Sequence, residues 1–230
     1  MRILIACEES DEVRGRFEKL GFDAWSCDIQ ENRNPHAKHY QCSIFDVIND
    51  GWDAMIAFPP CTHLAVSGAA WFEQKRKDGR QQNGIEFFMK MINAPIKHIA
   101  VENPIGIMSK IYRKPDQKIQ PYYFGDKAQK TTCLWLKNLP PLYHNEKPNL
   151  FDDKITHSDK GEFYEWIDSK TGKLKKQPLW YAQAFMNNKS ERSKIRSKTF
   201  PGIAEAMASQ WSNYLKNIYE TNKGIQTILK

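Results

Sequence analysis

The 230-residue sequence contains 34 lysines and arginines against 27 acidic residues, and its net charge of +7 favours an anionic partner, most simply nucleic acid. No stretch is long and apolar enough to span a bilayer, and the chain opens on a strand-like segment, so we expect no membrane anchor or signal peptide. The five cysteines are widely spaced and form no Cys-x-x-Cys pair, which argues against a disulfide framework and a zinc site. We therefore expect a cytoplasmic α/β protein with a small additional lobe.

The first 28 residues have the pattern of a nucleotide-type α/β fold. A buried strand over 1–6, a helix over 11–20 and a second strand over 23–27 follow one another, and Asp28 ends the second strand. An acidic residue at this place commonly binds the hydroxyl groups of a ribose. We favour this role for Asp28 over that of a solvated turn carboxylate.

The turn after the first strand, residues 7–10, contains no glycine. A pyrophosphate needs glycines there because the backbone must approach the phosphate closely. NAD and ATP are therefore disfavoured, while a ligand with a ribose and no phosphates, such as S-adenosylmethionine, remains compatible.

A later strand carries a candidate nucleophile. After a loop over 29–42 and an expected third strand over 42–46, with Asp46 near its carboxyl edge, a buried strand over 52–58 stops at two prolines and Cys61. Prolines lack a backbone donor and force a rigid turn at the strand end, which is the ligand-binding edge of α/β sheets. A thiol held there is a candidate nucleophile; the alternative is a small buried apolar cysteine.

A second strand also ends in polar residues and a proline. We expect a loop over 62–84, a helix over 85–92 and a strand over 96–101, which runs into Glu102-Asn103-Pro104. In a parallel sheet this end lies on the same edge as Cys61. A carboxylate beside a thiol favours a catalytic role for the pair.

The second half of the chain is less regular, and its character changes over residues 142–200. We expect irregular chain over 113–125, a strand over 131–136, a hairpin around 163–172 and a final helix from Ile203 that packs back on the sheet. Between 170 and 198 the basic residues outnumber one glutamate and alternate with aromatic residues, which is the strongest nucleic-acid footprint of the chain. The expected divisions are a catalytic domain over 1–141, a basic lobe over 142–192 and a returning segment over 193–230.

Two of these motifs together resemble a known family. Pro59-Pro60-Cys61 at the end of the fourth expected strand and Glu102-Asn103 at the end of the fifth are similar to the Pro-Cys and Glu-Asn motifs of the cytosine-5 DNA methyltransferases. Cys27-Asp28-Ile29 is similar to the segment that ends in the ribose-binding acid. The resemblance covers residues 1–140 and 193–215 and is greatest to the short members encoded by phages and prophages.

The resemblance implies a Rossmann-like, S-adenosylmethionine-dependent methyltransferase fold with a mostly parallel sheet, helices on both faces and a small basic lobe. It implies methylation of cytosine carbon 5 in DNA, in a bacterial or phage-infected cell, by way of a covalent Cys61 adduct. Glu102 would stabilise the activated base, Asn103 would fix the loop, and Pro60 would hold the thiol. The implied cofactor site comprises Ala6, Cys7, Glu8, Asp28, Ile29, Asp46, Phe58 and Pro59. The implied DNA contacts are Lys130, Lys173, Lys175, Lys176, Arg192 and Arg196. No metal and no membrane are implied.

The chain also departs from the family pattern. The first motif of the family is rich in glycine, whereas residues 6–10 have none, and Lys130 stands where the family has arginines. A methyltransferase-like protein that binds DNA without catalysis therefore stays open as an alternative. So does the same chemistry on single-stranded nucleic acid or a nucleotide. A cysteine hydrolase that uses His63 as its base is a further alternative.

Overall fold

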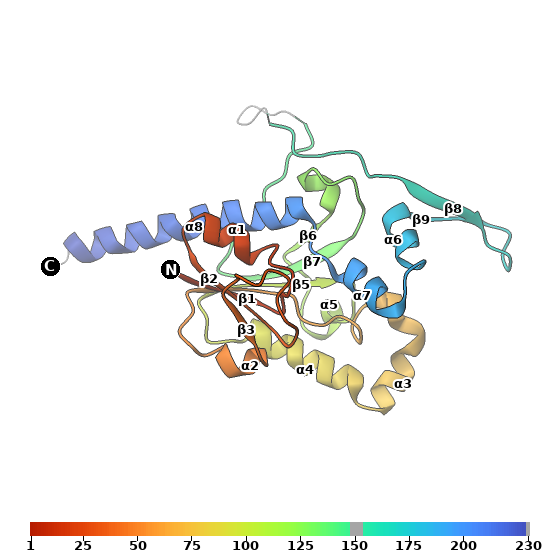
Figure 1. Ribbon diagram of the computed structural model, residues 1–230, viewed down its shortest axis with the longest axis horizontal. Coiled ribbons are helices and arrows are strands. Elements are labelled where there is room, and N and C mark those ends of the chain that lie inside the picture. Colours follow the sequence, from red (N-terminus) through yellow and green to blue (C-terminus); the bar gives the residue numbers. More distant parts are fainter. Residues whose placement is uncertain (148–153, 229–230) are drawn as a thin grey trace. The chain divides into compact units, whose positions relative to one another are not determined.

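The computed structural model describes residues 1–147 and 154–228, and its centre is a seven-stranded sheet (Figure 1). The strand order is β3-β2-β1-β4-β5-β7-β6, in which β1 to β5 pair in parallel and β7 is antiparallel to both neighbours. This mostly parallel order confirms the predicted Rossmann-like fold. The strands are β1 (Arg2–Ala6), β2 (Asp23–Asp28), β3 (His39–Gln41), β4 (Ala54–Ala57), β5 (His98–Pro104), β6 (Gln117–Ile119) and β7 (Thr132–Lys137).

Helices cover both faces of this sheet (Figure 1). Along β1, Leu4 and Ala6 point into the core on the side of α4, whereas Ile3 and Ile5 are buried on the opposite side, where α1 and α8 lie. Burial on both faces explains why the parallel strands are nearly continuous apolar runs. In chain order, the helices of the whole described chain, including those outside the large sheet's layers, are α1 (Arg14–Lys19), α2 (Ile44–Val47), η1 (Val66–Trp71), α3 (Phe72–Lys77), α4 (Arg80–Ile92), α5 (Met108–Ile111), η2 (Pro121–Phe124), α6 (Leu179–Ala184), α7 (Lys189–Ser197) and α8 (Pro201–Ile228).

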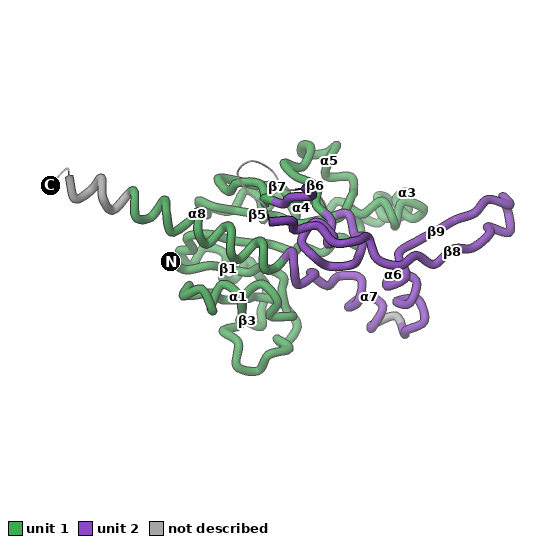
Figure 2. The backbone as a smooth tube through the Cα atoms, turned by 90° about the horizontal axis from the view of Figure 1, so that it is seen from above, with its two compact units in different colours: residues 1–119, 132–143, 204–230 green, residues 120–131, 144–203 purple. Residues whose placement is uncertain are grey.

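The chain divides into two compact units (Figure 2). Unit 1 contains the large sheet and comprises residues 1–119, 132–143 and 204–230. Unit 2 comprises residues 120–131 and 144–203 and contains a two-stranded antiparallel sheet of β8 (Phe163–Ile167) and β9 (Leu174–Pro178). This sheet is the hairpin that the sequence predicted.

Three local expectations are wrong. Residues 44–47 form the short helix α2, which Ser43 caps by accepting the Phe45 N–H, and the third strand is residues 39–41 instead. The region 62–84 contains η1, α3 and the start of α4 rather than a loop. The region 113–125 contains β6 and η2 rather than irregular chain only. No helix among the described residues is both long and apolar enough to cross a bilayer.

The core between α4 and the sheet generates a stability prediction. Phe88 is fully buried, and its ring meets that of Trp135 edge-on at 5.1 Å, so Phe88→Ala should lower the free energy of unfolding by about 3–5 kcal/mol. Its neighbour Phe87 is half-buried, so Phe87→Ala should cost less. Urea unfolding followed by tryptophan fluorescence measures both. Equal losses in the two variants would contradict this account of the core.

Candidate active site

The two motif-bearing strands are neighbours in the sheet. β4 and β5 pair in parallel, with Ala57 opposite Val101, so both chains leave the sheet at the same edge. Cys61 follows β4 after the two prolines, and Glu102 lies near the end of β5; both are half-buried. The structure therefore brings the two predicted catalytic segments to one edge.

A buried amide joins these two segments. Asn103 is 2% exposed, and its Nδ2 donates to the Pro59 carbonyl at 3.0 Å and to the Glu102 carbonyl at 2.9 Å. Since β4 ends at Ala57, the Pro59 carbonyl is beyond the strand ladder and takes its donor from a side chain instead. Asn103 thus ties the turn before Cys61 to the end of β5.

The backbone that follows each motif is joined as well. Val66 N donates to Ile105 O and Ile107 N donates to Leu64 O, each at 3.0 Å, on either side of an antiparallel bridge between Ala65 and Gly106. The chains approach so closely that a Cβ at Gly106 would lie 2.5 Å from the Leu64 carbonyl oxygen. The loops after Cys61 and after Glu102 are therefore one hydrogen-bonded assembly.

The residues of the implied cofactor site lie at the carboxyl ends of three adjacent strands, β2, β1 and β4. Ala6 lies opposite Cys27 on β2 and Ala57 on β4, so Cys7, Asp28 and Phe58 come next along this edge. Cys7 has a left-handed backbone with φ of 60°, and its N–H donates to Cys27 O at 2.7 Å. Burial raises the pKa of the Cys7 thiol far above its ordinary value, so this thiol stays protonated.

Asp28 and Ile29 differ in exposure. Burial raises the pKa of the Asp28 carboxyl, and its Oδ1 accepts the Gln30 N–H at 2.9 Å. Ile29 leaves 77% of its surface exposed, although an isoleucine at a strand end usually packs inward. Pro59 is buried and Phe58 is half-buried. Asp46 belongs to the first turn of α2 and is exposed, so the predicted position at a strand edge is wrong for this residue.

Glu8 turns back into the protein. It is 3% exposed, and its carboxylate accepts the Val13 N–H at 2.7 Å and the Arg14 N–H at 3.1 Å, at the beginning of α1. Burial raises its pKa to about 7 although these two hydrogen bonds lower it. In dinucleotide-binding proteins, backbone N–H groups at this place donate to a phosphate. Here they donate to the Glu8 side chain instead.

The basic residues that were expected to contact DNA belong to unit 2, and several are engaged within it. The Lys130 ammonium donates to the Lys198 carbonyl at 2.9 Å, and Lys175 pairs with Asp168 in the hairpin. Arg192 donates to the Phe185 carbonyl at 3.2 Å and stacks on the Phe185 ring. The remaining three are Lys173, which is exposed, Lys176, which lies over the Phe163 ring, and Arg196, which lies over the Tyr181 ring.

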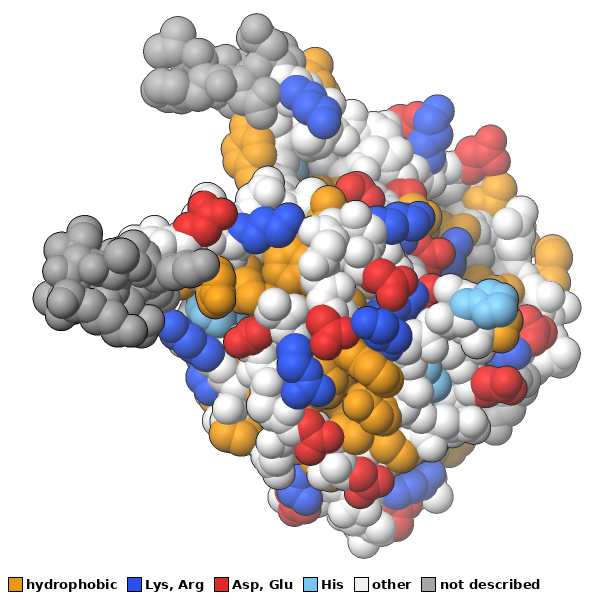
Figure 3. Space-filling view, turned by 60° about the vertical axis from the view of Figure 1, so that its left-hand side comes forward, with side chains coloured by type: hydrophobic (Ala, Val, Ile, Leu, Met, Phe, Trp, Pro, Cys, Tyr) orange, Lys and Arg blue, Asp and Glu red, His pale blue; other side chains and the backbone are white. Residues whose placement is uncertain are grey.

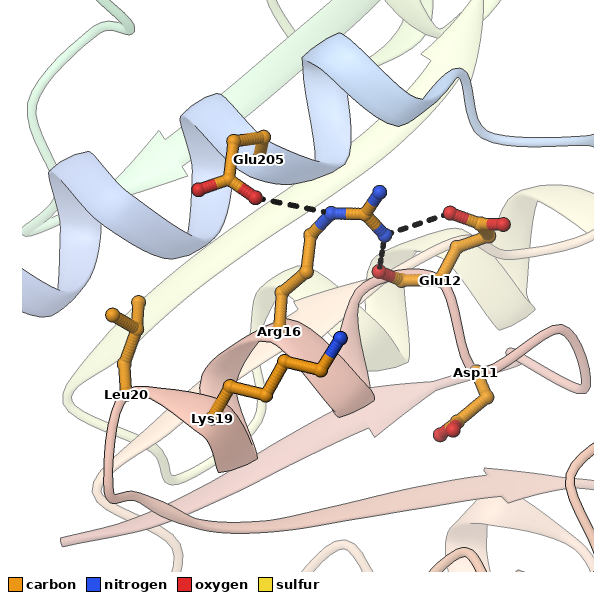
Figure 4. A pocket seen from close by; sticks show the side chains of 6 residues that line it. All are labelled: Asp11, Glu12, Arg16, Lys19, Leu20 and Glu205. Carbon is orange, nitrogen blue, oxygen red and sulfur yellow. Dashed lines mark hydrogen bonds and ion pairs between the residues drawn. The ribbon is translucent and has the colours of Figure 1, made fainter.

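A hollow elsewhere on unit 1 is a poor ligand site. It has a volume of about 340 Å³ and lies between α1 and α8 (Figure 4). Its Arg16 already pairs with Glu12 at 2.7 Å and with Glu205 at 3.2 Å. The molecular face in Figure 3 likewise carries basic and acidic side chains intermingled. No group of three or more His, Cys, Asp or Glu among residues 1–147 and 154–228 could hold a metal ion.

Two residues of the site were missed by the sequence reasoning. Gly106 was detectable, because an isolated glycine just after a strand often marks a close backbone approach. Lys75 is 7% exposed and contacts the loop after Cys61, but it lies in a basic run that gives no sign of burial. His63 was considered as a base; its Nδ1 is buried without a hydrogen-bond partner among the described residues.

Comparisons with known proteins give likenesses among solved structures only. No protein-family profile matches the chain, and no curated protein matches it in sequence. A solved structure from E. coli, described as a proposed DNA modification methyltransferase encoded within a prophage, superposes with a TM-score of 0.44 at 17% identity. The match covers 67% of this chain and 53% of the other, so it spans about half the length of that protein. A likeness at this level carries no argument about activity.

Gly106→Ala should open the bridge between the two loops. Its added methyl group would meet the Leu64 carbonyl, and we expect a cost of about 1–3 kcal/mol together with faster exchange of the Val66 and Ile107 amides. Gly84→Ala is the matched control, because the nearest atoms to its Cβ would belong to side chains and not to the backbone, the first being a Leu64 methyl group at 3.3 Å. Hydrogen-exchange mass spectrometry compares the two. Unchanged exchange in Gly106→Ala would refute the close-approach argument.

Glu8 should make stability depend on pH. Its pKa is raised from 4.5 to about 7 in the folded protein, so its contribution is full below pH 4.5 and is lost as pH rises through 7. Relative to Glu8→Gln, the wild type should therefore lose up to about 3 kcal/mol of unfolding free energy across this range. Urea unfolding at several pH values measures the difference. Glu86→Gln, at an exposed position of α4, controls for the loss of one charge, and parallel curves for Glu8→Gln and the wild type would contradict the prediction.

Proposed function

We propose that this chain is a DNA methyltransferase that acts on carbon 5 of cytosine, with Cys61 as the nucleophile. The observation that supports this most directly is the junction of the two motif segments, where the Asn103 side chain donates to the Pro59 carbonyl at 3.0 Å. This bond holds the chain before Cys61 against the end of the strand that carries Glu102. A thiol and a carboxylate at adjacent strand ends suit an addition to an aromatic ring.

In the proposed reaction, the Cys61 thiolate adds to carbon 6 of a cytosine, and carbon 5 thereby gains the electron density of an enamine. Cysteine suits this step because its thiolate is strongly nucleophilic and also leaves readily. Glu102, in its protonated form, donates to ring nitrogen 3 and stabilises the charge that develops on the ring. Once carbon 5 carries the methyl group, loss of its proton forms the ring double bond again and expels the Cys61 thiolate. In duplex DNA the target base has to leave the helical stack to reach the thiol.

The proposed cofactor is S-adenosylmethionine, which when bound supplies the methyl group. The residues at the ends of β1, β2 and β4 fit such a ligand. Asp28 would bind the ribose hydroxyl groups, and the exposed Ile29 side chain offers an apolar surface to the adenine. The Glu8 carboxylate occupies the amides at the beginning of α1, which suits a ligand without phosphates.

A second candidate is a protein of the same fold that binds nucleic acid without catalysis. It is favoured by the glycine-free turn after β1, in which Cys7 and Glu8 are committed to contacts inside the protein. Single-stranded nucleic acid is an alternative substrate in either case. The Tyr164 and Trp166 rings of the hairpin stack at 5.8 Å, and Tyr164 is 50% exposed, so unpaired bases could extend this stack.

Transfer of tritium from labelled S-adenosylmethionine to cytosine-containing DNA tests the proposal. The wild type should label duplex DNA, Cys61→Ser should not, and Glu102→Gln should be slower by roughly 10²–10³-fold because it removes a donor to the charged ring. Cys42→Ser, at a half-buried thiol beyond β3, is the control and should retain transfer.

The same DNA, with single-stranded DNA beside it, separates the candidates. Labelling of single strands alone would change the substrate but keep the chemistry. Absence of transfer to either DNA, together with DNA binding by wild type and Cys61→Ser alike, would replace the enzyme proposal with the binding-protein one.

A further inference from the structure

A buried lysine lies behind the loop that carries Cys61. Lys75 belongs to α3 and is 7% exposed, whereas its neighbours Arg76 and Lys77 are exposed. Lysine is rarely buried, because withdrawing an ammonium group from water is costly unless protein groups replace the water. The position therefore calls for a specific partner.

The partner is the backbone next to Cys61. The Lys75 Nζ donates to the Thr62 carbonyl at 2.7 Å, and Thr62 directly follows Cys61. Room for the ammonium comes from Gly68, since a Cβ there would lie 3.1 Å from the Lys75 Nζ. Within the same turn, Leu64 N donates to the Cys61 carbonyl at 2.9 Å. Both carbonyls at the nucleophile are thus held in place, one of them by a cation.

The other charged groups around this turn do not supply that cation. Burial, followed by the charges of Lys75 and Arg80, lowers the pKa of His63, so this ring is neutral near pH 7. Arg80 pairs with Asp78 at 2.6 Å. On β5, the nearby titratable group is the carboxyl of Glu102. Among the described basic residues of α3, α4 and the turn after Cys61, Lys75 is therefore the one that is buried.

We propose that Lys75 is a positioning residue for Cys61: its ammonium fixes the turn through the Thr62 carbonyl, and its charge favours the Cys61 thiolate. A nearby cation stabilises a thiolate and increases the fraction of reactive sulfur at neutral pH. This inference deepens the proposed function, but thiolate formation requires neither the cofactor nor DNA, so it can be measured separately.

The test is the rate at which iodoacetamide alkylates Cys61 between pH 5 and 10, read by mass spectrometry of the peptide that contains Cys61. Reading one peptide separates this thiol from the other four cysteines. In the wild type the midpoint of the pH profile should lie below the value of about 8.5 for an ordinary cysteine. In Lys75→Met it should rise by about one unit, which makes alkylation at pH 7 roughly tenfold slower.

Two further variants complete the experiment. Lys77→Met, on the same helix but exposed and paired with Glu73 at 2.9 Å, should leave the profile of Cys61 unchanged. Lys75→Arg keeps the charge and should retain a midpoint below that of Lys75→Met; if Lys75→Met does not fold by circular dichroism, Lys75→Gln takes its place.

Identical profiles in the wild type and a folded, uncharged variant at position 75 would overturn the proposal. So would a wild-type midpoint at or above that of free cysteine. A shifted profile without tritium transfer to DNA would support the role of Lys75 while refuting the methyltransferase. Tritium transfer to DNA together with an unshifted alkylation profile would support the methyltransferase and refute the role of Lys75. The failure of one proposal can therefore be told from the failure of the other.

Discussion

The hydrogen bond from the Asn103 amide to the Pro59 carbonyl is the constraint on which the site depends. Two prolines end β4 without donating to the sheet, and the Pro59 carbonyl lies past the last ladder bond of that strand. Leaving such a carbonyl buried and unpaired costs about 1–3 kcal/mol. Asn103 is fixed in turn by its place on β5, opposite Cys133 of β7. The central sheet therefore fixes the orientation of the turn that carries Cys61, through the Asn103 side chain.

The sheet could be predicted because its strands are buried on both faces and therefore leave long apolar runs in the sequence. Residues 2–6, 98–101 and 132–136 are of this kind, and each lies within one of the predicted strands. Strand ends were predictable for a related reason, since prolines and acids mark where the ladder stops. Asp28 is the last residue of β2, and Cys61 follows β4 after the two prolines, as predicted. The predicted end of the fifth strand is wrong, because β5 continues past Glu102 to Pro104 by pairing with β7.

The elements that the sequence analysis predicted wrongly are short, and their structure depends on a capping residue or on a distant strand as much as on their own residues. Residues 44–47 form a short apolar run that suits a strand or a helix, and the Ser43 cap decides for the helix. β6 has three residues and depends on β7 for its pairing, which no local pattern reveals. Lys75 is buried where it donates to the Thr62 carbonyl, and Glu8 turns inward where it accepts the Val13 N–H at the beginning of α1. The sequence shows both residues as charged and gives no indication that either is buried.

The larger part of unit 2, residues 144–203, is inserted between β7 and the residues of α8 that belong to unit 1, which affects the order in which the protein can be built. Trp211 is fully buried and donates to the Pro140 carbonyl at 2.9 Å, so the far face of the sheet is covered by residues from beyond the insertion. During translation, the part of this apolar face that α8 covers stays exposed until α8 has left the ribosome. We therefore expect chaperones to bind nascent chains mostly while the inserted segment is being synthesised. The core is complete only after this long segment has formed a closed loop that brings α8 back to the sheet.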